Sequence, residues 1–261
     1  MFETPKRALI TGASSGMGAA LAVRLGKRGV EVWLSARRKD KLEEQVATIT
    51  AAGGKAHAVE LDVTDADATY EKLKALDAKF GIELAVANAG IGGSTAMQDV
   101  ATMPWSDTRK VFDTNLLGAV ATINAFIPGM VARGRGHIVG VSSIAGAFPL
   151  PRGAAYSASK AGFTLYLEAI AIELRALGIP VTAIVPAFVR TPMAETLDEP
   201  TPFMVELERA IDIIARAITR RARVVQFPFQ YSFIAGAANA IPRGLRAFAI
   251  TKALAGNRKA S

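Results

Sequence analysis

Short apolar runs rich in Val, Ile and Leu alternate along the chain with longer segments that have the periodicity of amphipathic helices. In a parallel sheet each strand is buried on both faces, so it appears in the sequence as a continuous apolar run followed by a helix. The pattern predicts seven strands, at Arg7–Thr11, Glu31–Ala36, Lys55–Leu61, Leu84–Asn88, Gly136–Ser142, Pro180–Val185 and Arg223–Phe227. We therefore expect an α/β protein, with a doubly wound parallel sheet of about seven strands and helices on both faces.

The segments between these strands carry their own helix signals. A helical pattern from Ala19 to Arg28 is followed by Gly29, and Thr64 with Asp67 resembles a capping box before the next helix. Long helices are predicted at Trp105–Arg133 and Ala154–Leu177. A last helix would place Ile211, Ile214 and Ile218 on one face and the basic residues Arg209, Arg216, Arg220 and Arg223 on another.

Nothing in the chain resembles an interdomain linker, so residues 1–261 are predicted to form a single domain. Two segments stand out within it. Residues 186–204 contain Pro186, Pro192, Pro200 and Pro202 and are expected to form a loop that covers a substrate or cofactor site. Residues 228–261 form an apolar, basic tail, which we expect to act as a lid on the substrate pocket.

The composition excludes several kinds of site. The chain has no cysteine and only two histidines, His57 and His137, so neither a disulfide framework nor a metal site is expected. The first residues lack the charged, apolar and small-residue regions of a secretory signal, and a cytoplasmic location is expected.

The net charge of +8 is unevenly distributed. Nine lysines and arginines and no acidic residue lie between Ile213 and Ser261, so the rest of the chain carries a net charge of −1. This distribution does not favour nucleic-acid binding. An acidic ligand, a weak contact with a membrane surface and a plain solvated face all remain open.

A glycine-rich loop follows the first strand directly. It reads Thr11-Gly12-Ala13-Ser14-Ser15-Gly16-Met17-Gly18 and leads into the first helix. Glycines allow a tight turn and let a pyrophosphate approach the helix N-terminus, where free N–H groups favour an anion. Because the loop joins the first strand to the first helix, it predicts a dinucleotide site of the Rossmann type.

The end of the second strand indicates which dinucleotide binds. A carboxylate there would bond the ribose 2′-hydroxyl of NAD, but this sequence has Arg37 and Arg38 instead. Two guanidinium groups suit a 2′-phosphate, so NADP(H) is expected in preference to NAD(H). Arg37 and Arg38 could also be a solvated cap on the sheet. Asp62, after the third strand, is a candidate acceptor from the adenine amino group, or a turn former.

Four motifs in order give the chain a family resemblance. They are the glycine loop, Asn88-Ala89-Gly90 after the fourth strand, Ser142-Ser143 after the fifth, and Tyr156-Ser157-Ala158-Ser159-Lys160 on the helix that follows. From about Lys6 to Thr191 the chain resembles the short-chain dehydrogenases/reductases. The resemblance implies catalytic roles for Asn115, Ser143, Tyr156 and Lys160, and an oligomer, dimeric or tetrameric, formed through the two long helices. It implies cofactor contacts from Gly12, Ser14, Ser15, Gly16, Met17, Gly18, Arg37, Arg38, Asp62, Val63, Asn88, Ala89, Gly90, Tyr156, Lys160, Pro186, Val189 and Thr191.

The chemistry of these residues supports the same conclusion. Carbonyl reduction needs a hydride donor, a proton donor and a group that holds the oxygen. Tyr156 and Lys160 are four residues apart and share a helix face, so the ammonium is expected to lower the pKa of the phenol. Ser143 would orient the substrate oxygen. By resemblance, Asn115 would hold a water that relays protons to Lys160.

One departure and two rival functions remain. The family's usual Pro-Gly after the sixth strand is Pro186-Ala187 here, so the loop beside the nicotinamide is expected to differ. A lipophilic carbonyl or alcohol substrate is expected from the aromatic tail and from the apolar residues Phe148, Leu150, Phe188, Met193 and Phe203, any of which could instead belong to the core. The rivals are a non-catalytic NADP(H)-binding sensor and a membrane-peripheral scaffold on the same fold.

Overall fold

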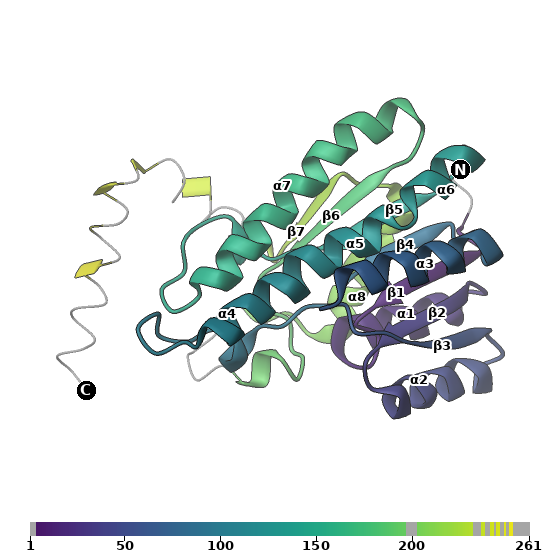
Figure 1. Cartoon of the computed structure of the whole chain (residues 1–261), viewed down its shortest axis with the longest axis horizontal. Helices are drawn as coiled ribbons and strands as arrows, with labels where there is room; N and C mark the ends of the chain where they lie inside the picture. The colour runs from purple at the N-terminus through teal and green to yellow at the C-terminus, as the bar shows by residue number, and fades with distance from the viewer. Residues whose placement is uncertain are drawn as a thin grey trace.

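The computed structural model describes residues 4–196 and 203–231, and beyond them residues 236–237, 241–242, 244–245, 248 and 251–252. A seven-stranded sheet with strand order β3-β2-β1-β4-β5-β6-β7 runs through its centre (Figure 1). The strands are β1 (Arg7–Thr11), β2 (Glu31–Ala36), β3 (Ala56–Glu60), β4 (Leu84–Ala87), β5 (His137–Val141), β6 (Val181–Pro186) and β7 (Val224–Phe227). Neighbouring strands are parallel throughout. The prediction of seven strands is confirmed to within one residue at each end.

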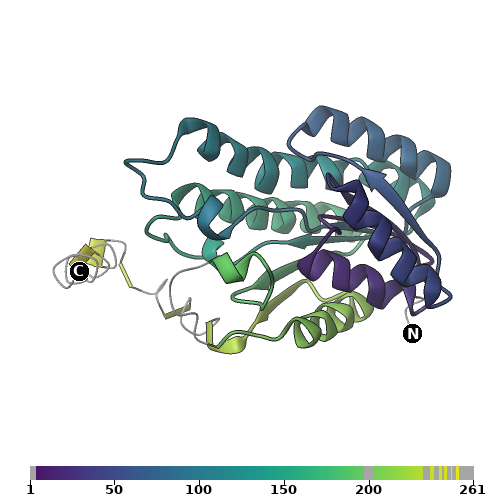
Figure 2. The same ribbon diagram turned by 90° about the horizontal axis from the view of Figure 1, so that it is seen from below.

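Helices cover both faces of the sheet (Figures 1 and 2). One face carries α1 (Gly16–Gly26), α2 (Lys39–Ala51) and α8 (Leu207–Arg220), and the other carries α3 (Ala66–Phe80), α5 (Gly118–Asn124) and α7 (Ala154–Ala176). Each layer has its own apolar core. Ile211, Ile214 and Ile218 pack into the first, as their spacing predicts, while Phe126 and Phe163 are the largest fully buried side chains of the second. The fold is thus Rossmann-like and doubly wound.

The strand order creates a crevice between β1 and β4. The chain runs outward from β1 to β2 and β3, then returns to the other side of β1 with β4. The connections that leave β1 and β4 therefore diverge onto opposite faces of the sheet. Ligands of open α/β sheets bind at such a switch point, outside the carboxyl ends of the strands.

The start of α3 differs from the sequence prediction. Asp65 caps the helix by accepting from Ala68 N at 3.0 Å, so the predicted capping box of Thr64 and Asp67 is wrong. Thr64 is committed to a turn before the helix begins, because its N–H and hydroxyl both donate to Asp62 Oδ1.

The predicted helix Trp105–Arg133 is interrupted. It consists of α4 (Trp105–Phe112), a π-helical turn at Asp113–Leu117, α5, a break at Ala125 and Phe126, and α6 (Ile127–Arg133). Within the described residues it is also the one helical stretch long and apolar enough to cross a membrane. Half of its apolar window is buried inside the protein, as expected for a helix that packs on a sheet core.

Buried polar contacts stabilise the end of the sheet at which the strands begin, opposite the switch point. Asp77, near the end of α3, accepts from both terminal nitrogens of Arg133 at 2.8 and 3.0 Å and from Ile82 N at 2.8 Å. His137, the first residue of β5, bonds Thr182 Oγ1 through Nε2 at 2.8 Å. Burial lowers the pKa of His137 to about 4, with a smaller contribution from the positive charge of Arg221.

The two segments singled out in the sequence are described only in part. Of the predicted loop 186–204, residues 197–202, which include Pro200 and Pro202, lie outside the described residues. Of the predicted tail, the described residues from 236 onward are all exposed, and none of them lines the cavity at the carboxyl ends of β1 and β4. A role for the tail as a lid stays a prediction.

Candidate active site

Thr11 and Asn88 join the ends of β1 and β4. Thr11 Oγ1 accepts from Asn88 N at 3.1 Å and from Ala89 N at 3.2 Å. In return, Asn88 Nδ2 donates to Thr11 O at 2.9 Å and to Gly12 O at 3.2 Å. The side chain of Asn88, predicted as a cofactor contact, thus holds the glycine loop in place. Thr11 was not among the predicted site residues, although its position at the end of the first strand was visible in the sequence.

The glycine loop has a shape that only glycine allows. Gly12 has φ +67°, and a Cβ there would lie 2.7 Å from Ala89 Cα. A Cβ on Gly18 would lie 2.4 Å from Asn88 Nδ2 and from Gly12 O. The loop ends at Ser15, the N-cap residue of α1, whose side chain makes no capping hydrogen bond. The first-turn amides of this eleven-residue helix are therefore not capped by Ser15, and Gly16 and Met17 of that turn line the cavity described next, as a bound phosphate would require.

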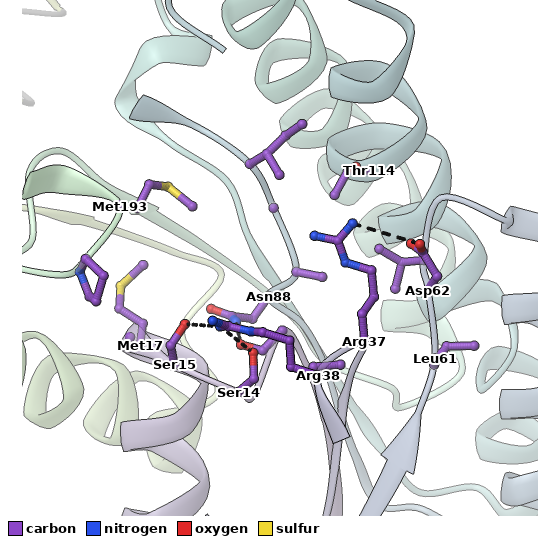
Figure 3. A pocket seen from close by; sticks show the side chains of 18 of the residues that line it. Ser14, Ser15, Met17, Arg37, Arg38, Leu61, Asp62, Asn88, Thr114 and Met193 are labelled. Atoms are coloured by element: carbon purple, nitrogen blue, oxygen red, sulfur yellow. Dashed lines mark hydrogen bonds and ion pairs between the residues drawn. The ribbon is translucent and has the colours of Figure 1, made fainter. Parts of the chain in front are cut away.

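A cavity of about 250 Å³ opens above this loop (Figure 3). Thirteen predicted cofactor residues line it: Gly12, Ser14, Ser15, Gly16, Met17, Arg37, Arg38, Asp62, Val63, Asn88, Ala89, Gly90 and Thr191. The unpredicted lining residues are Ala36, Leu61, Thr64, Ile91, Thr114, Pro192 and Met193. Residues from six separate places in the sequence thus meet at the switch point, and the glycine cradle fits a dinucleotide.

The two arginines at the end of β2 are placed differently. Arg38 Nη2 donates to Ser14 Oγ at 3.0 Å and to Ser15 Oγ at 3.1 Å, which draws the guanidinium over the glycine loop (Figure 3). Arg37 Nη1 lies 3.9 Å from Asp62 Oδ2, and both side chains are about half exposed. Both arginines line the cavity, but Arg38 lies closer to the loop that would hold the phosphates.

Tyr156 and Ser143 meet at the carboxyl end of β5. Tyr156 lies in the first turn of α7, and its hydroxyl hydrogen-bonds the side chain of Ser143. Ser143 Oγ also accepts from Ala145 N at 3.2 Å, which fixes the serine at the start of a 3₁₀ turn, Ile144–Gly146. Burial raises the pKa of Tyr156, and the hydrogen bond from Ser143 opposes this effect.

Lys160 lies one helical turn further on and is buried. Its Nζ donates to Val141 O at 3.0 Å, and burial lowers the pKa of Lys160 to about 8. The sequence led us to expect a lowered pKa for Tyr156. The structure gives the opposite direction for the pKa of Tyr156, because desolvation of the phenol dominates.

Asn115 lies in the π-helical turn and is fully buried. Its Oδ1 accepts from Ile91 N at 2.8 Å, and its Nδ2 donates to Ile91 O at 2.9 Å and to Ser159 Oγ at 3.4 Å. A Cβ on Gly90 would lie 3.2 Å from Asn115 Oδ1 and 3.5 Å from Lys160 Nζ, so the two side chains flank this glycine. Both amide hydrogens are used, which leaves one lone pair on Oδ1 for a water.

Five predicted cofactor residues lie outside the cavity lining: Gly18, Tyr156, Lys160, Pro186 and Val189. Pro186 ends β6, and Val189 pairs with Val205 in an isolated bridge. Ala187 is not one of the described non-glycine residues with positive φ, and its N–H donates to Phe227 O at 2.9 Å, so a loop that differs from the family's stays a prediction. The backbone hydrogen bonding between β6 and β7 thus extends to the first residue after β6.

Some residues beside Tyr156 were not predicted. A Cβ on Gly92 would lie 2.9 Å from Met193 Sδ and 3.4 Å from Tyr156 Cε2. The adjacent glycines Gly92 and Gly93 were a visible signal of a close approach, but the sequence does not say what approaches them. Within the described residues, no group of three or more His, Asp or Glu side chains is placed to hold a metal ion.

The fold and this site define a class of protein, the Rossmann-type dinucleotide-binding oxidoreductases. Comparison with known proteins identifies the family. The family model described as "short chain dehydrogenase" matches residues 6–202. An uncharacterized oxidoreductase of Myxococcus xanthus is 44% identical over 92% of this chain and 94% of its own length. A 3-oxoacyl-[acyl-carrier-protein] reductase of Staphylococcus aureus is 35% identical over 76% of this chain and 80% of its own. The chain belongs to the short-chain dehydrogenase/reductase family of oxidoreductases.

Solved structures agree with this assignment. A short-chain dehydrogenase from Sphingobium yanoikuyae in complex with NADPH superposes with a TM-score of 0.79 at 27% identity, covering 91% of this chain and 96% of that one. A metagenomic short-chain oxidoreductase in complex with NADP has a TM-score of 0.73 at 32% identity, covering 85% and 94%.

Proposed function

We propose that the protein reduces a small-molecule aldehyde or ketone with NADPH, or oxidises the matching alcohol with NADP⁺. The observation that carries this proposal is the pairing of the Tyr156 hydroxyl with the Ser143 side chain, close to Met193, which lines the dinucleotide cavity. Two hydroxyl groups that converge there can hold one carbonyl oxygen, as carbonyl reduction requires.

The residues of the chain handle the proton and the oxygen of this reaction. The bound nicotinamide supplies or accepts the hydride. In reduction, Ser143 and Tyr156 donate hydrogen bonds to the carbonyl oxygen, and Tyr156 transfers its proton as the carbon gains the hydride. Because burial raises the pKa of Tyr156, the phenol stays protonated and ready to donate at neutral pH.

In oxidation Tyr156 must first lose its proton. A positive charge one helical turn away favours the phenolate, and this is the role we assign to Lys160. An oxidised nicotinamide, being cationic, would favour the phenolate as well when bound. Asn115 and Lys160 flank Gly90 and are proposed to hold a water between them, through which Tyr156 exchanges protons with solvent.

NADP(H) is the proposed cofactor because cations, not a carboxylate, follow β2. Arg38 over the glycine loop and Arg37 beside it suit a 2′-phosphate. Asp62 and Val63 line the same cavity and are proposed to contact the adenine. The NADPH and NADP complexes of the two structural relatives support this choice.

The test is a panel of aldehydes and ketones screened by loss of NADPH absorbance, with NADH in parallel. Tyr156→Phe should lower kcat at least a thousandfold while NADPH affinity changes less than threefold, since only the reacting hydroxyl is removed. Tyr166→Phe is the matched control, because that tyrosine is on the same helix but bonds Asn124. NADPH binding without turnover of any carbonyl would favour the rival function, an NADP(H)-binding sensor.

A homodimer or homotetramer is proposed from exposed apolar side chains on the long helices. Trp105 and Leu117 on the α4–α5 stretch and Leu165 and Ile172 on α7 are 50% to 75% exposed. Side chains of this size that face solvent in groups mark protein interfaces.

The C-terminal segment is proposed to make a weak contact with an anionic membrane surface. Phe229, Ile241, Leu245 and Phe248 are exposed, and all charged residues from Ile213 onward are basic. Exposed apolar groups among lysines and arginines are the chemistry of interfacial adsorption. The protein would then act as a peripheral enzyme.

A further inference from the structure

Residues 191–196, called here the covering segment, reach from the glycine loop to the segment after β4. A Cβ on Gly16 would lie 3.6 Å from the Thr191 methyl group, so the near end of the covering segment contacts the loop. At the far end, Thr196 Oγ1 accepts from Ser94 N at 3.2 Å and donates to Met193 O at 2.9 Å. The covering segment therefore closes one side of the cavity and is fastened there by Thr196.

Two glycines allow this close approach. A Cβ on Gly93 would lie 2.1 Å from Thr196 Oγ1 and 2.7 Å from Met193 O, and Gly93 has φ +59°. Gly92 has φ −156°, an extended conformation that any residue can adopt. A glycine is therefore needed at this position for steric reasons and not for its backbone conformation. A Cβ built on Gly92 would lie 2.9 Å from Met193 Sδ and 3.4 Å from Tyr156 Cε2, so both side chains border the space that this glycine leaves free.

Met193 thus lines the cavity and also lies near the tyrosine ring. It lines the cavity, which is also bounded by Gly90 and Ile91, and its side chain is 42% exposed (Figure 3). A carbonyl held by Tyr156 and facing a cofactor in the cavity would therefore lie near this thioether. The side chain is unbranched, flexible and polarizable, and such side chains pack well on flat apolar groups.

We infer that Met193 is a specificity-determining residue, which contacts an apolar or aromatic substituent of the substrate carbonyl. The inference rests on the proposed function, because it needs a carbonyl bound at Tyr156. It identifies the substrate class as aldehydes and ketones with an apolar group, and it predicts that the size of this group is limited by Met193.

The test compares benzaldehyde and 2-naphthaldehyde as probes. Met193→Ala should raise the ratio of kcat/KM for 2-naphthaldehyde over benzaldehyde about tenfold, since one methylene in an apolar pocket already changes discrimination by that factor. Met97→Ala is the matched control and should leave the ratio within about twofold of the wild-type value, because Met97 packs against Gly153 instead of Gly92. In Met193→Ala, the Kd for NADPH should change by a smaller factor than the ratio of the two kcat/KM values.

A double-mutant cycle sharpens the test. Gly92→Ala would push the Met193 thioether aside, so on its own it should also change the ratio. In the Met193→Ala background it should have no further effect, because the colliding sulfur is gone. Melting temperatures of all variants establish that they are folded.

The inference is overturned if Met193→Ala has the wild-type ratio, if the two substitutions act additively, or if Met193→Ala mainly weakens NADPH binding. It is also wrong if other carbonyls are reduced while both aldehydes stay inert in wild type and Met193→Ala. If the wild-type protein reduces no carbonyl in the panel, the proposed function itself fails, which is a different result.

Discussion

Asn88, Asn115 and Lys160 each direct a polar side chain at main-chain carbonyls: Thr11 and Gly12, Ile91, and Val141. These bonds fix the positions of the side chains before any ligand binds. The sequence identified all three residues by their motifs, but the partner carbonyls belong to Thr, Gly, Ile and Val residues that carry no signal of their own. Residue identity was therefore predictable, whereas the contact was not.

The same limit applies to the pKa of Tyr156. The four-residue spacing from Lys160 was read correctly, yet a pKa depends on burial, and burial depends on tertiary packing. Met193 was noted in the sequence only as one of several apolar residues near the site. Its position beside Gly92 comes from a contact between segments about one hundred residues apart.

Arg38→Ala should raise the Kd for NADPH about tenfold to a hundredfold and leave that for NADH nearly unchanged, because charge-assisted bonds of about 1.5–3 kcal/mol are lost. Fluorescence titration of both nucleotides measures this. Arg37→Ala is the comparison and should have the smaller effect, since Arg37 lies towards Asp62. Equal binding of NADH and NADPH by the wild-type protein would refute the role of both arginines.

The buried His137 should make stability fall in mild acid. Its pKa in the folded protein is about 4, below the ordinary value of 6.5. The unfolded chain therefore binds more protons between these values, and stability is lost as the pH falls from about 6.5 towards 4. The loss should be on the order of 3 kcal/mol.

Urea unfolding of the wild type and of His137→Gln at pH 7 and pH 4.5 checks this, because the variant lacks the titrating ring. His57→Gln, at an exposed position, serves as the control. Identical pH dependence in wild type and His137→Gln would show that the ring is not the cause.

At the level of elements, the strands were predicted almost residue by residue because strands in a parallel sheet are buried on both faces. Helix boundaries were less certain. A capping residue acts through one hydrogen bond, so Thr64 and Asp65 are hard to distinguish in sequence. The π-helical turn adds a single residue to one turn of the helix. This change is too small to be seen in the periodicity of apolar residues, so the sequence did not predict it.

The ion pair of Asp77 and Arg133 joins α3 to α6. Arg133→Met should destabilise the fold by about 3–5 kcal/mol, since it leaves a buried carboxylate without its bidentate partner. Arg135→Met, which removes an exposed guanidinium 3.7 Å from Glu83, should cost less than about 1 kcal/mol.

Chemical denaturation measures both variants. The double variant Asp77→Asn with Arg133→Met should recover part of the loss, because no uncompensated charge remains. If it is less stable than Arg133→Met alone, the carboxylate is not the source of the instability.

The whole molecule has an uneven charge that the sequence alone revealed. A slightly acidic body carries the dinucleotide site, and the basic, apolar residues gather towards the C-terminus. What this segment contacts depends on surfaces outside the chain, so the sequence left a lid, a membrane and a solvated tail open.

Vesicle sedimentation tests the membrane contact. The full chain should bind vesicles of phosphatidylglycerol and phosphatidylcholine, bind pure phosphatidylcholine at least tenfold more weakly, and dissociate in high salt. Leu245→Asp with Phe248→Asp should reduce binding to the anionic vesicles by a similar factor without changing turnover of a soluble substrate. Equal binding to both kinds of vesicle would exclude the electrostatic contact.

The π-helical turn at Asp113–Leu117 contains Asn115, so the number of residues in this turn determines where the Asn115 side chain lies. Immediately after the turn, Gly118 packs so closely on the loop after β3 that a Cβ would lie 2.2 Å from Val63 O. Each helical residue adds about 100° of rotation, so a chain one residue shorter between Asn115 and Gly118 could keep only one of the two in register. When homologues are aligned, a gap at this place therefore distinguishes proteins that share the geometry of Asn115 from those that merely share the asparagine.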